Sequence, residues 1–251
     1  MSFVNEGVCP KCGRVLMFYV APDGTRTQMM CKCEREERQQ QSLRREATAK
    51  TLESKRKLQL FMECVGERYK DKSFSNYNPA GKNKEHYLLI MDMAKHFDKY
   101  MEKGTGALLY GHYGCGKTHL EIALGRLLAE QDHSVKMFGT SALYSRYMSA
   151  YSWRERETPN SVIEDACDCD LLILDDFGVD IIDTDKSNFE RFCYALINYR
   201  YNQKKPVVIS TNLKPEELKQ LVTMRVYDRL RAMVKPAINH SLSGREEAGK
   251  D

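Results

Sequence analysis

The stretch "GHYGCGKTHL", residues 111–120, decides the fold. Residues 111–118 fit the pattern G-x-x-x-x-G-K-[ST]. The apolar residues 107–110 before it predict a short buried strand. The leucines and alanines that recur at helical spacing after Thr118 predict a helix. Strand, glycine-rich loop and helix form the context in which this pattern holds the phosphates of a nucleotide.

The residue types of the loop suit this chemistry. Glycines let backbone N–H groups turn toward a phosphate, and the helix N-terminus adds further donors and a partial positive charge. Lys117 is expected to reach the β- and γ-phosphates, and the Thr118 hydroxyl is expected to ligate Mg²⁺. The alternative is a glycine-rich turn with a solvated lysine, which the complete match in this context disfavours. The residues predicted to hold ATP or ADP here are Gly111, Gly114, Gly116, Lys117, Thr118 and His119.

Composition indicates a soluble protein with a substantial core. The chain has 251 residues, of which 42% are hydrophobic and 29% charged. No apolar run approaches the ~18 residues of a membrane span, and the N-terminus lacks the apolar segment of a signal peptide. We therefore expect a cytoplasmic protein without a membrane partner, whose nine cysteines bind metal or are buried. Residues 1–70 hold 14 basic against 9 acidic side chains, and this small excess is a weak indication of an acidic partner or nucleic acid.

The chain divides into three zones. Residues 1–33 carry paired cysteines and a hairpin-like segment, and residues 34–63 read as a charged helical linker. Residues 64–251 alternate strand-like and helix-like segments, which predicts an α/β fold with a parallel sheet flanked by helices. We expect strands at 107–110, 135–139, 171–175 and 207–211, and helices near 83–102, 117–131, 141–151, 186–203 and 215–223.

Two cysteine pairs near the N-terminus predict a zinc site. Cys9 and Cys12 form a C-x₂-C pair, and a C-x-C pair of Cys31 and Cys33 follows the hairpin. A module of about 33 residues buries too little apolar surface to fold alone, so bound Zn²⁺ would supply the missing stability. The alternatives are a redox C-x₂-C pair or unrelated thiols. The cysteines expected to be small buried side chains are Cys64, Cys167, Cys169 and Cys193.

Two further segments end in polar side chains where a parallel sheet places its ligands. In "DLLILDDFG", residues 170–178, Asp175 is placed to hold Mg²⁺ through water and Asp176 to orient or deprotonate the attacking water. In "PVVISTN", residues 206–212, Asn212 is placed either to reach the γ-phosphate or to cap the following helix.

Two arginine-containing segments leave alternatives open. Within residues 224–233, Arg225 and Arg229 are candidates to complete the active site of an adjacent subunit, or they are ordinary solvated arginines. Residues 144–157 mix aromatic side chains with arginines. This segment is either a contact for single-stranded DNA or an amphipathic helix with a charged face.

Taken in order, "GHYGCGKTHL", "LLILDDFG", "VVISTN" and "RVYDRL" resemble the AAA+ ATPases of the DnaC/DnaI helicase-loader and IstB group. The segment "GERYKDKSFSNY", residues 66–77, is similar to the entry into that group's ATPase domain. The resemblance covers about residues 64–247. The cysteine module with its charged linker looks like the zinc-binding, helicase-contacting end of DnaI-type loaders.

The resemblance implies a role for each matching position. Lys117 and Thr118 match the Walker A pair, and Asp175 and Asp176 match the Walker B carboxylates. Asn212 matches sensor 1. The arginine finger matches Arg229 or Arg225, and Arg245 matches the sensor 2 arginine, although Gly244 stands where the family usually has an aromatic residue.

Only 39 residues follow Asn212, so no C-terminal helical lid is expected, and such loaders are similar in lacking it. The resemblance implies an ATP-dependent loader that binds a hexameric replicative helicase through residues 1–60 and engages single-stranded DNA. It would assemble with other copies when ATP is bound and release on hydrolysis, with weak turnover until DNA or a partner stimulates it. The alternative is an IstB-type transposition ATPase that remodels duplex DNA.

Overall fold

The computed structural model describes residues 2–79, 83–152, 156–178 and 186–240. It forms two compact units, Met1–Glu53 and Ser54–Asp251. Arg245 and Arg154 lie outside the described residues. Among the described helices, none is long and apolar enough to cross a membrane.

The first unit contains a small antiparallel sheet and most of a long helix. Strand β1 (Ser2–Val8) pairs with β2 (Val15–Val20), which pairs with β3 (Arg26–Gln28). The turn between β2 and β3 is closed by the Ala21 N–H, which donates to the Thr25 carbonyl at 2.9 Å. Helix α1 (Lys32–Cys64) starts between Cys31 and Cys33, so Cys33 lies in its first turn, and the helix continues into the second unit.

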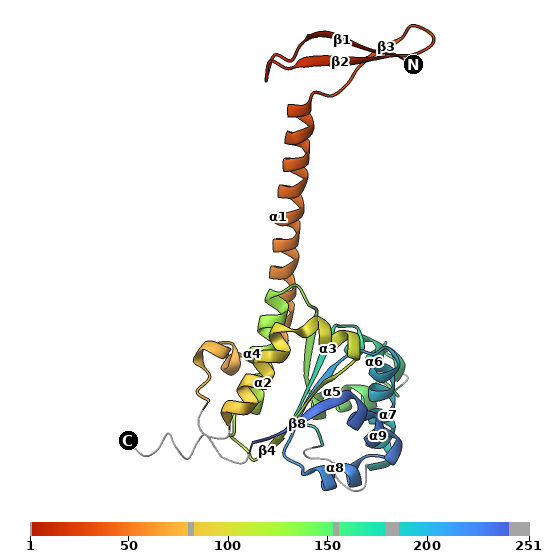
Figure 1. Cartoon of the computed structure of the whole chain (residues 1–251). Helices are drawn as coiled ribbons and strands as arrows, with labels where there is room; N and C mark the ends of the chain where they lie inside the picture. The colour runs from red at the N-terminus through yellow and green to blue at the C-terminus, as the bar shows by residue number, and fades with distance from the viewer. Residues whose placement is uncertain (1, 80–82, 153–155, 179–185, 241–251) are drawn as a thin grey trace. The chain divides into compact units, whose positions relative to one another are not determined.

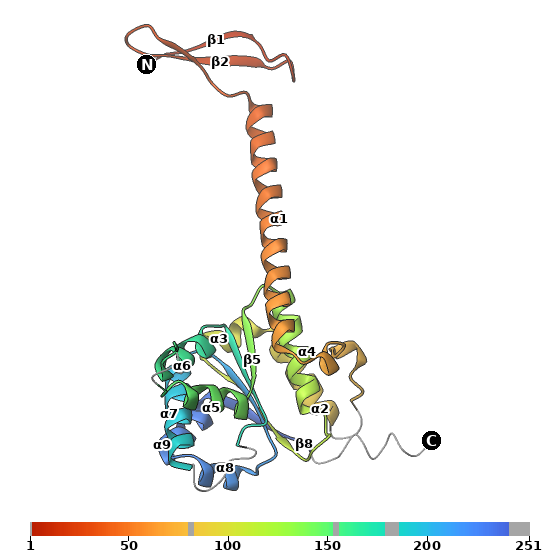
Figure 2. The ribbon, with the colours of Figure 1, turned by 180° about the vertical axis from the view of Figure 1, so that it is seen from behind.

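The second unit is built on a five-stranded parallel sheet in the order β5-β6-β7-β4-β8 (Figures 1 and 2). The strands are β4 (Gly106–Gly111), β5 (Val135–Gly139), β6 (Leu171–Asp175), β7 (Val207–Thr211) and β8 (Val234–His240). Their near-continuous apolar runs are typical of a parallel sheet that is buried on both faces. The helices are α2 (Asn83–Lys95), α3 (Phe97–Lys103), α4 (Lys117–Glu130), α5 (Thr140–Ser149), α6 (Pro159–Cys167), α7 (Lys186–Asn202), α8 (Pro215–Leu221) and α9 (Met224–Met233), with the short 3₁₀ turns Glu67–Tyr69 and Phe74–Asn76 before them.

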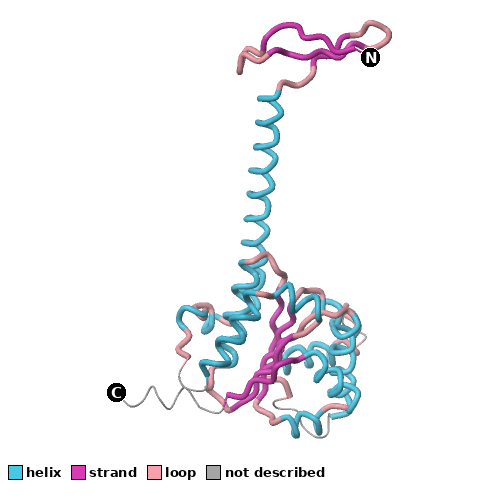
Figure 3. The backbone as a smooth tube through the Cα atoms, in the orientation of Figure 1, coloured by secondary structure: helices cyan, strands magenta, loops and turns pink. Residues whose placement is uncertain are grey.

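Two layers of helices cover this sheet (Figure 3). On one face, α2, α3, α4 and the end of α1 bury a core that includes Phe61, Ile90 and Leu120. On the other, α5, α6, α7, α8 and α9 bury a core that includes Tyr144, Phe189 and Leu230. The predicted α/β fold with a parallel sheet between helices is therefore confirmed.

In the second unit the four predicted strands are present, but one strand and two helices were missed, and strand β1 of the first unit was missed too. Strand β8 contains Pro236, a residue that weakens a strand prediction, and it pairs in parallel with β4 at the sheet edge. Helix α6 was missed although its start is marked by Thr158, whose side chain accepts from the Ser161 N–H, and by a proline in the first turn. Helix α9 was missed as well. The predicted helix at 83–102 is two helices, which meet at His96.

The last part of α1 belongs to the second unit. Phe61 is fully buried against α4, where a Cβ atom on Gly125 would lie only 2.3 Å from the Phe61 ring. Ser54 Oγ donates to the Glu130 carbonyl at 2.8 Å, and the Lys57 ammonium pairs with Asp132 Oδ1 at 2.9 Å. Both contacts lie at the C-terminal end of α4, where a helix leaves carbonyl groups without helical partners.

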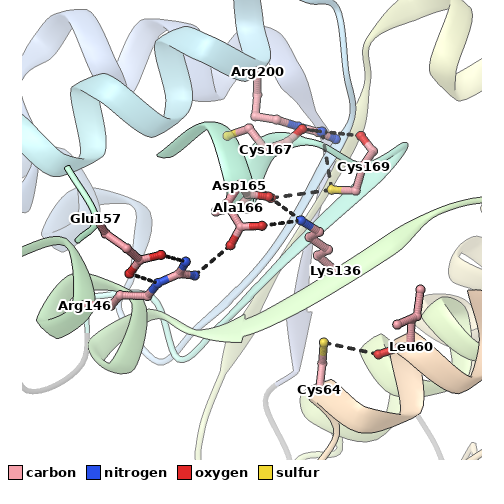
Figure 4. Close-up of polar contacts among 10 residues, drawn as sticks. All are labelled: Leu60, Cys64, Lys136, Arg146, Glu157, Asp165, Ala166, Cys167, Cys169 and Arg200. Atoms are coloured by element: carbon pink, nitrogen blue, oxygen red, sulfur yellow. Dashed lines mark hydrogen bonds and ion pairs between the residues drawn. The ribbon is translucent and has the colours of Figure 1, made fainter. Parts of the chain in front are cut away.

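Three of the four cysteines expected to be buried are buried, but Cys64 is exposed at the end of α1. Burial raises the pKa of the Cys167 thiol to about 12. Close by, the fully buried Arg200 donates to the carbonyls of Cys167 at 3.0 Å and Cys169 at 2.7 Å (Figure 4). Its guanidinium also donates to the carbonyls of Asp170 and Pro206, the residues just before β6 and β7. Arg200 therefore links α7 to the start of these two strands.

Candidate nucleotide-binding site

The glycine-rich loop follows β4 and leads into α4, as the sequence predicts. Gly114 (φ 79°) and Gly116 (φ 89°) lie in the left-handed region that favours glycine. A Cβ atom at Gly116 would also lie 3.0 Å from the Tyr77 ring. The loop backbone therefore requires glycine on conformational grounds, and at Gly116 on steric grounds too.

Lys117 is the first residue of α4 and is only 5% exposed. Its ammonium group donates to the carbonyls of Gly111 at 2.9 Å and His112 at 3.1 Å. It also donates to Asn212 Oδ1 at 2.7 Å. A buried cation surrounded by neutral oxygens at a helix N-terminus fits an anionic ligand such as a phosphate.

Oxygen atoms from three elements meet beside the lysine. Thr118 Oγ1 donates to Asp175 Oδ1 at 3.1 Å, and Ser210 Oγ donates to the same oxygen at 2.5 Å. Thr118 and Asp175 are the predicted magnesium-binding residues, and the structure brings them together. Hydroxyl and carboxylate oxygens are the ligands that Mg²⁺ prefers, so this donor set fits the ion. Ser210, on β7 next to β6, was not predicted.

Asp176 directly follows β6 and has an exposed side chain. Its backbone has a φ of 52°, an uncommon value for a residue other than glycine. The Asp176 N–H donates to Ser210 Oγ at 3.0 Å and to Asp175 Oδ1 at 3.1 Å, and these bonds hold the strained turn. The second carboxylate therefore lies at the end of the sheet where Asn212 follows β7, with its side chain exposed.

His119 contacts the segment before α2. Its Nε2 atom lies 2.9 Å from the Ser73 carbonyl oxygen and 3.1 Å from Asn76 Oδ1, and its ring packs edge-on against Tyr77. Burial lowers the pKa of His119 below its ordinary value of 6.5. These contacts place the His119 ring beside Tyr77, whose ring lies next to the loop at Gly116. The nucleotide contact of His119 stays a prediction.

Glu121 is a buried residue of this region that sequence reasoning missed. It is fully buried on α4, one turn beyond Lys117. Burial raises its pKa well above the ordinary value, and the negative charge of Asp175 raises it further. A glutamate between the apolar residues of a buried helix stretch, "LEIAL", was the signal available in the sequence.

The candidate finger arginines lie on α9, where it packs against α7. The Arg229 guanidinium lies over the rings of Tyr194 and Tyr201, at 5.3 and 5.5 Å from their centroids, and Arg225 lies 6.0 Å from Tyr194. Arg225 and Tyr194 also line a surface cavity of about 440 Å³. The structure brings neither arginine to the phosphate loop of its own chain.

Within the described part of the segment 144–157, two aromatic side chains belong to the core, and a third, Tyr151, is 61% exposed. Tyr144 and Tyr147 are buried in the core beside α7. Arg146 is paired with Glu157 and with Asp165, at 2.8 Å from Asp165 Oδ2 (Figure 4). Of the two interpretations that the sequence left open, the amphipathic helix is the one that these contacts favour.

The four predicted zinc ligands converge in the first unit. Their sulfur atoms all lie within 4.8 Å of one another, with Cys9 3.7 Å from Cys33 and Cys12 3.5 Å from Cys31. Tetrahedral zinc with bonds of about 2.3 Å requires sulfurs separated by about 3.8 Å, so the cluster fits the ion. The N–H groups of Cys12 and Lys11 help to lower the pKa of the Cys9 thiol to about 7.

With this geometry established, comparison with known proteins identifies the family. The model of the bacterial DnaA ATPase domain matches residues 69–236, which is more than half of the chain. The chain belongs to the bacterial DnaA ATPase domain family. The matched residues run from the segment that carries Tyr77 to strand β8, and they include the whole of the nucleotide site described above.

The proteins that are similar in sequence to this chain include helicase loaders. The replicative helicase loader DnaC of Buchnera aphidicola subsp. Baizongia pistaciae is 27% identical over 169 residues, which are 66% of each chain. The uncharacterized protein YdaV of Escherichia coli K12 is 27% identical over 159 residues, 63% of this chain and 61% of YdaV. The chain therefore spans just under two thirds of the length of these relatives.

Solved structures show the same fold. The crystal structure of the DnaC helicase loader matches with a TM-score of 0.62 at 21% identity, covering 70% of this chain and all of that one. The structure of DnaI matches with a TM-score of 0.56 at 19% identity, covering 72% of this chain and 94% of that one. The DnaA-family ATPase fold of residues 69–236 is thus shared with proteins of the DnaC and DnaI type.

Proposed function

We propose that this protein is an ATP-dependent loader of a hexameric replicative helicase onto single-stranded DNA. The observation that carries the proposal is the convergence of Lys117, Thr118, Asp175 and Asn212 at one edge of the sheet, in a chain similar to DnaC over 66% of its length. The cysteine cluster of the first unit would then contact the helicase, as the resemblance to DnaI-type loaders implies.

In this proposal each residue of the nucleotide site has a defined task. Lys117 and the loop N–H groups bind the β- and γ-phosphates of ATP, and Thr118 and Asp175 hold the Mg²⁺ that neutralises their charge. Asp176 orients or deprotonates the attacking water, and Asn212 positions the γ-phosphate or that water. Arg229 or Arg225 would reach the site of the next subunit in an ATP-dependent homo-oligomer, and Arg245 would act as sensor 2.

Hydrolysis in such a site serves as a release switch. ATP would stabilise the assembled, DNA-bound form, and loss of the γ-phosphate would remove the contacts that favour it. Turnover would be weak until DNA or the partner completes the site. Because Tyr144 and Tyr147 are buried, any DNA contact of α5 would use its exposed side chains rather than these rings.

The decisive experiment is co-migration with a hexameric replicative helicase in gel filtration, with ATP, with ADP and without nucleotide. The full chain is compared with a deletion of residues 1–53. A deletion to residue 60 would also remove Ser54 and Lys57, which bind the C-terminal end of α4. A complex that requires residues 1–53 supports the loader. If no complex forms under any condition, the loader proposal is wrong, and binding of duplex DNA would then test the IstB-type transposition ATPase.

A further inference from the structure

The edge strand β5 borders a groove that is lined by none of the residues of the nucleotide site. β5 is the first strand in the order, so β6 is its only strand neighbour within the described part of the chain. Beside β5 lies a cavity of about 500 Å³. Its walls are Leu60, Glu63 and Cys64 of α1 and Asp165 and Asp168 at the end of α6.

The groove is lined by β5 and by helices from both faces of the sheet, α1 on one face and α6 on the other. The Val135 side chain of β5 packs into the core on the side of α1 and α4. The next residue, Lys136, points the other way and binds Asp165 of α6 at 2.9 Å, while Leu60 and Cys64 lie across the gap on α1 (Figure 4). Because successive side chains of a strand alternate in direction, a strand added to β5 would present side chains to both walls in turn.

The charges of the groove define what such a strand must carry. Its two cations are already neutralised, Lys136 by Asp165 and Lys57 by Asp132. Among the described residues, no cation pairs with Glu63, which accepts only from the neutral Gln59 amide, or with Asp168. One uncompensated carboxylate therefore stands on each wall, and Leu60, 51% exposed, adds an apolar contact.

We propose that β5 is a docking edge for an extended basic segment of a partner protein. The segment pairs with the β5 backbone as a sixth strand, places lysine or arginine side chains against Glu63 and Asp168, and packs an apolar side chain on Leu60. Main-chain hydrogen bonds supply affinity in this mode of recognition, and the side chains on the two walls supply specificity. An edge strand that stays uncovered can pair with strands of other chains and cause aggregation, so proteins usually protect such edges.

The test uses the full chain and an eight-residue fluorescent peptide that alternates arginine and valine, measured by fluorescence anisotropy. A second peptide of the same sequence carries N-methyl groups on alternate residues, which keeps its charge but prevents strand pairing. We expect the first peptide to bind and the second to bind at least about tenfold more weakly. Bound peptide should also slow amide hydrogen exchange across residues 135–139.

Charge-reversing variants locate the site. Glu63→Lys with Asp168→Lys changes two exposed side chains and should weaken binding of the first peptide by about tenfold or more. The matched control, Glu102→Lys with Glu216→Lys, makes the same change in net charge at exposed positions outside the groove and should leave binding unchanged. Absence of binding at millimolar peptide overturns the proposal. Equal loss in both double variants, or binding without protection of β5, does so too, because it would show non-specific attraction.

Discussion

Lys117 Nζ lies 2.7 Å from Asn212 Oδ1, although 95 residues separate the two in the chain. The pairing of β4 with β7 explains this meeting, because Tyr110 lies opposite Thr211 and both strands end at the same edge of the sheet. The lysine that starts α4 and the amide that follows β7 therefore form one polar site. Any ligand that binds the ammonium group is within reach of the amide as well.

The first prediction concerns nucleotide binding at this lysine. Lys117→Ala removes the buried ammonium group and should abolish ATP binding in isothermal titration. Asn212→Ala removes only one neutral acceptor and should leave binding within a few-fold while slowing hydrolysis at least about tenfold. Lys219→Ala, at an exposed position of α8, is the matched control and should bind normally. Normal ATP affinity in Lys117→Ala would contradict the site.

The second prediction separates the two adjacent carboxylates. Asp176→Asn keeps the size of the side chain but removes the base, so it should bind ATP with Mg²⁺ normally and turn over about 100-fold more slowly. Asp175→Asn should instead weaken the dependence of ATP binding on Mg²⁺. The reason is that Asp175 Oδ1, which accepts from the Thr118 hydroxyl, belongs to the proposed magnesium site. Single-turnover hydrolysis and magnesium titrations distinguish the two. An Asp176→Asn protein with unchanged turnover would refute the proposed base.

The third prediction concerns the packing of Phe61 of α1 against Gly125 of α4. Gly125→Ala improves helix propensity by about 1 kcal/mol, but its methyl group would lie 2.3 Å from the Phe61 ring. We expect the steric cost to win, with a net loss of about 1–3 kcal/mol in the free energy of unfolding.

A double variant provides the control for this packing. Phe61→Leu should make Gly125→Ala nearly harmless, which a thermodynamic cycle of the two changes would reveal as a coupling energy. If the two effects simply add, the Phe61–Gly125 contact does not set the position of α1.

The nucleotide site was largely predictable from sequence because its parts are local. Residues 107–131 specify strand, turn and helix within one segment, and Asp175 and Asp176 follow an unbroken run of four apolar residues. Ser210 was missed because its role depends on β7 lying beside β6, which the sequence does not state. Glu121 was missed because its burial results from packing of the whole helix layer.

Contacts with residues far away in the sequence also determine where His119 and the aromatic side chains of residues 144–157 lie. The direction of His119 depends on Ser73 and Asn76, more than forty residues earlier in the chain. The aromatics of 144–157 looked available for stacking, but α7 covers Tyr144 and Tyr147 with Phe189 and Phe192. A periodic pattern predicts that such a helix has a buried face, and only the fold shows which residues occupy it.

The fourth prediction concerns the metal of the first unit. Protein purified without chelators should contain about one zinc ion per chain, and Cys12→Ser should reduce this content. Chelation should remove hydrogen-exchange protection from β1 and β2, because the small sheet depends on the metal. Cys64→Ser, at an exposed position outside the cluster, is the control. A zinc-free protein that keeps this protection would show that the four thiols are not a structural metal site.

The fifth prediction concerns acid stability of the Arg146 cluster. Hydrogen bonding to Arg146 lowers the pKa of Glu157 below its ordinary value of 4.5. Burial raises the pKa of Asp165, but bonds from Lys136 and Arg146 outweigh it, so this pKa lies below 3.8. A carboxyl group with a lowered pKa stabilises the fold above its ordinary pKa, and this contribution is lost as the pH falls through the lowered value.

Arg146→Met should therefore lower the unfolding temperature by a few degrees at pH 7, where both carboxylates are ionised and lose their partner. The difference from the unmodified protein should shrink as the pH falls from about 4.5 toward 3, because protonated carboxyl groups gain nothing from the guanidinium. Thermal unfolding at closely spaced pH values measures this. Arg45→Met, an exposed change in α1, should show no such pH dependence. A constant difference for Arg146→Met across the whole range would mean that its hydrocarbon packing, and not its charge, stabilises α5.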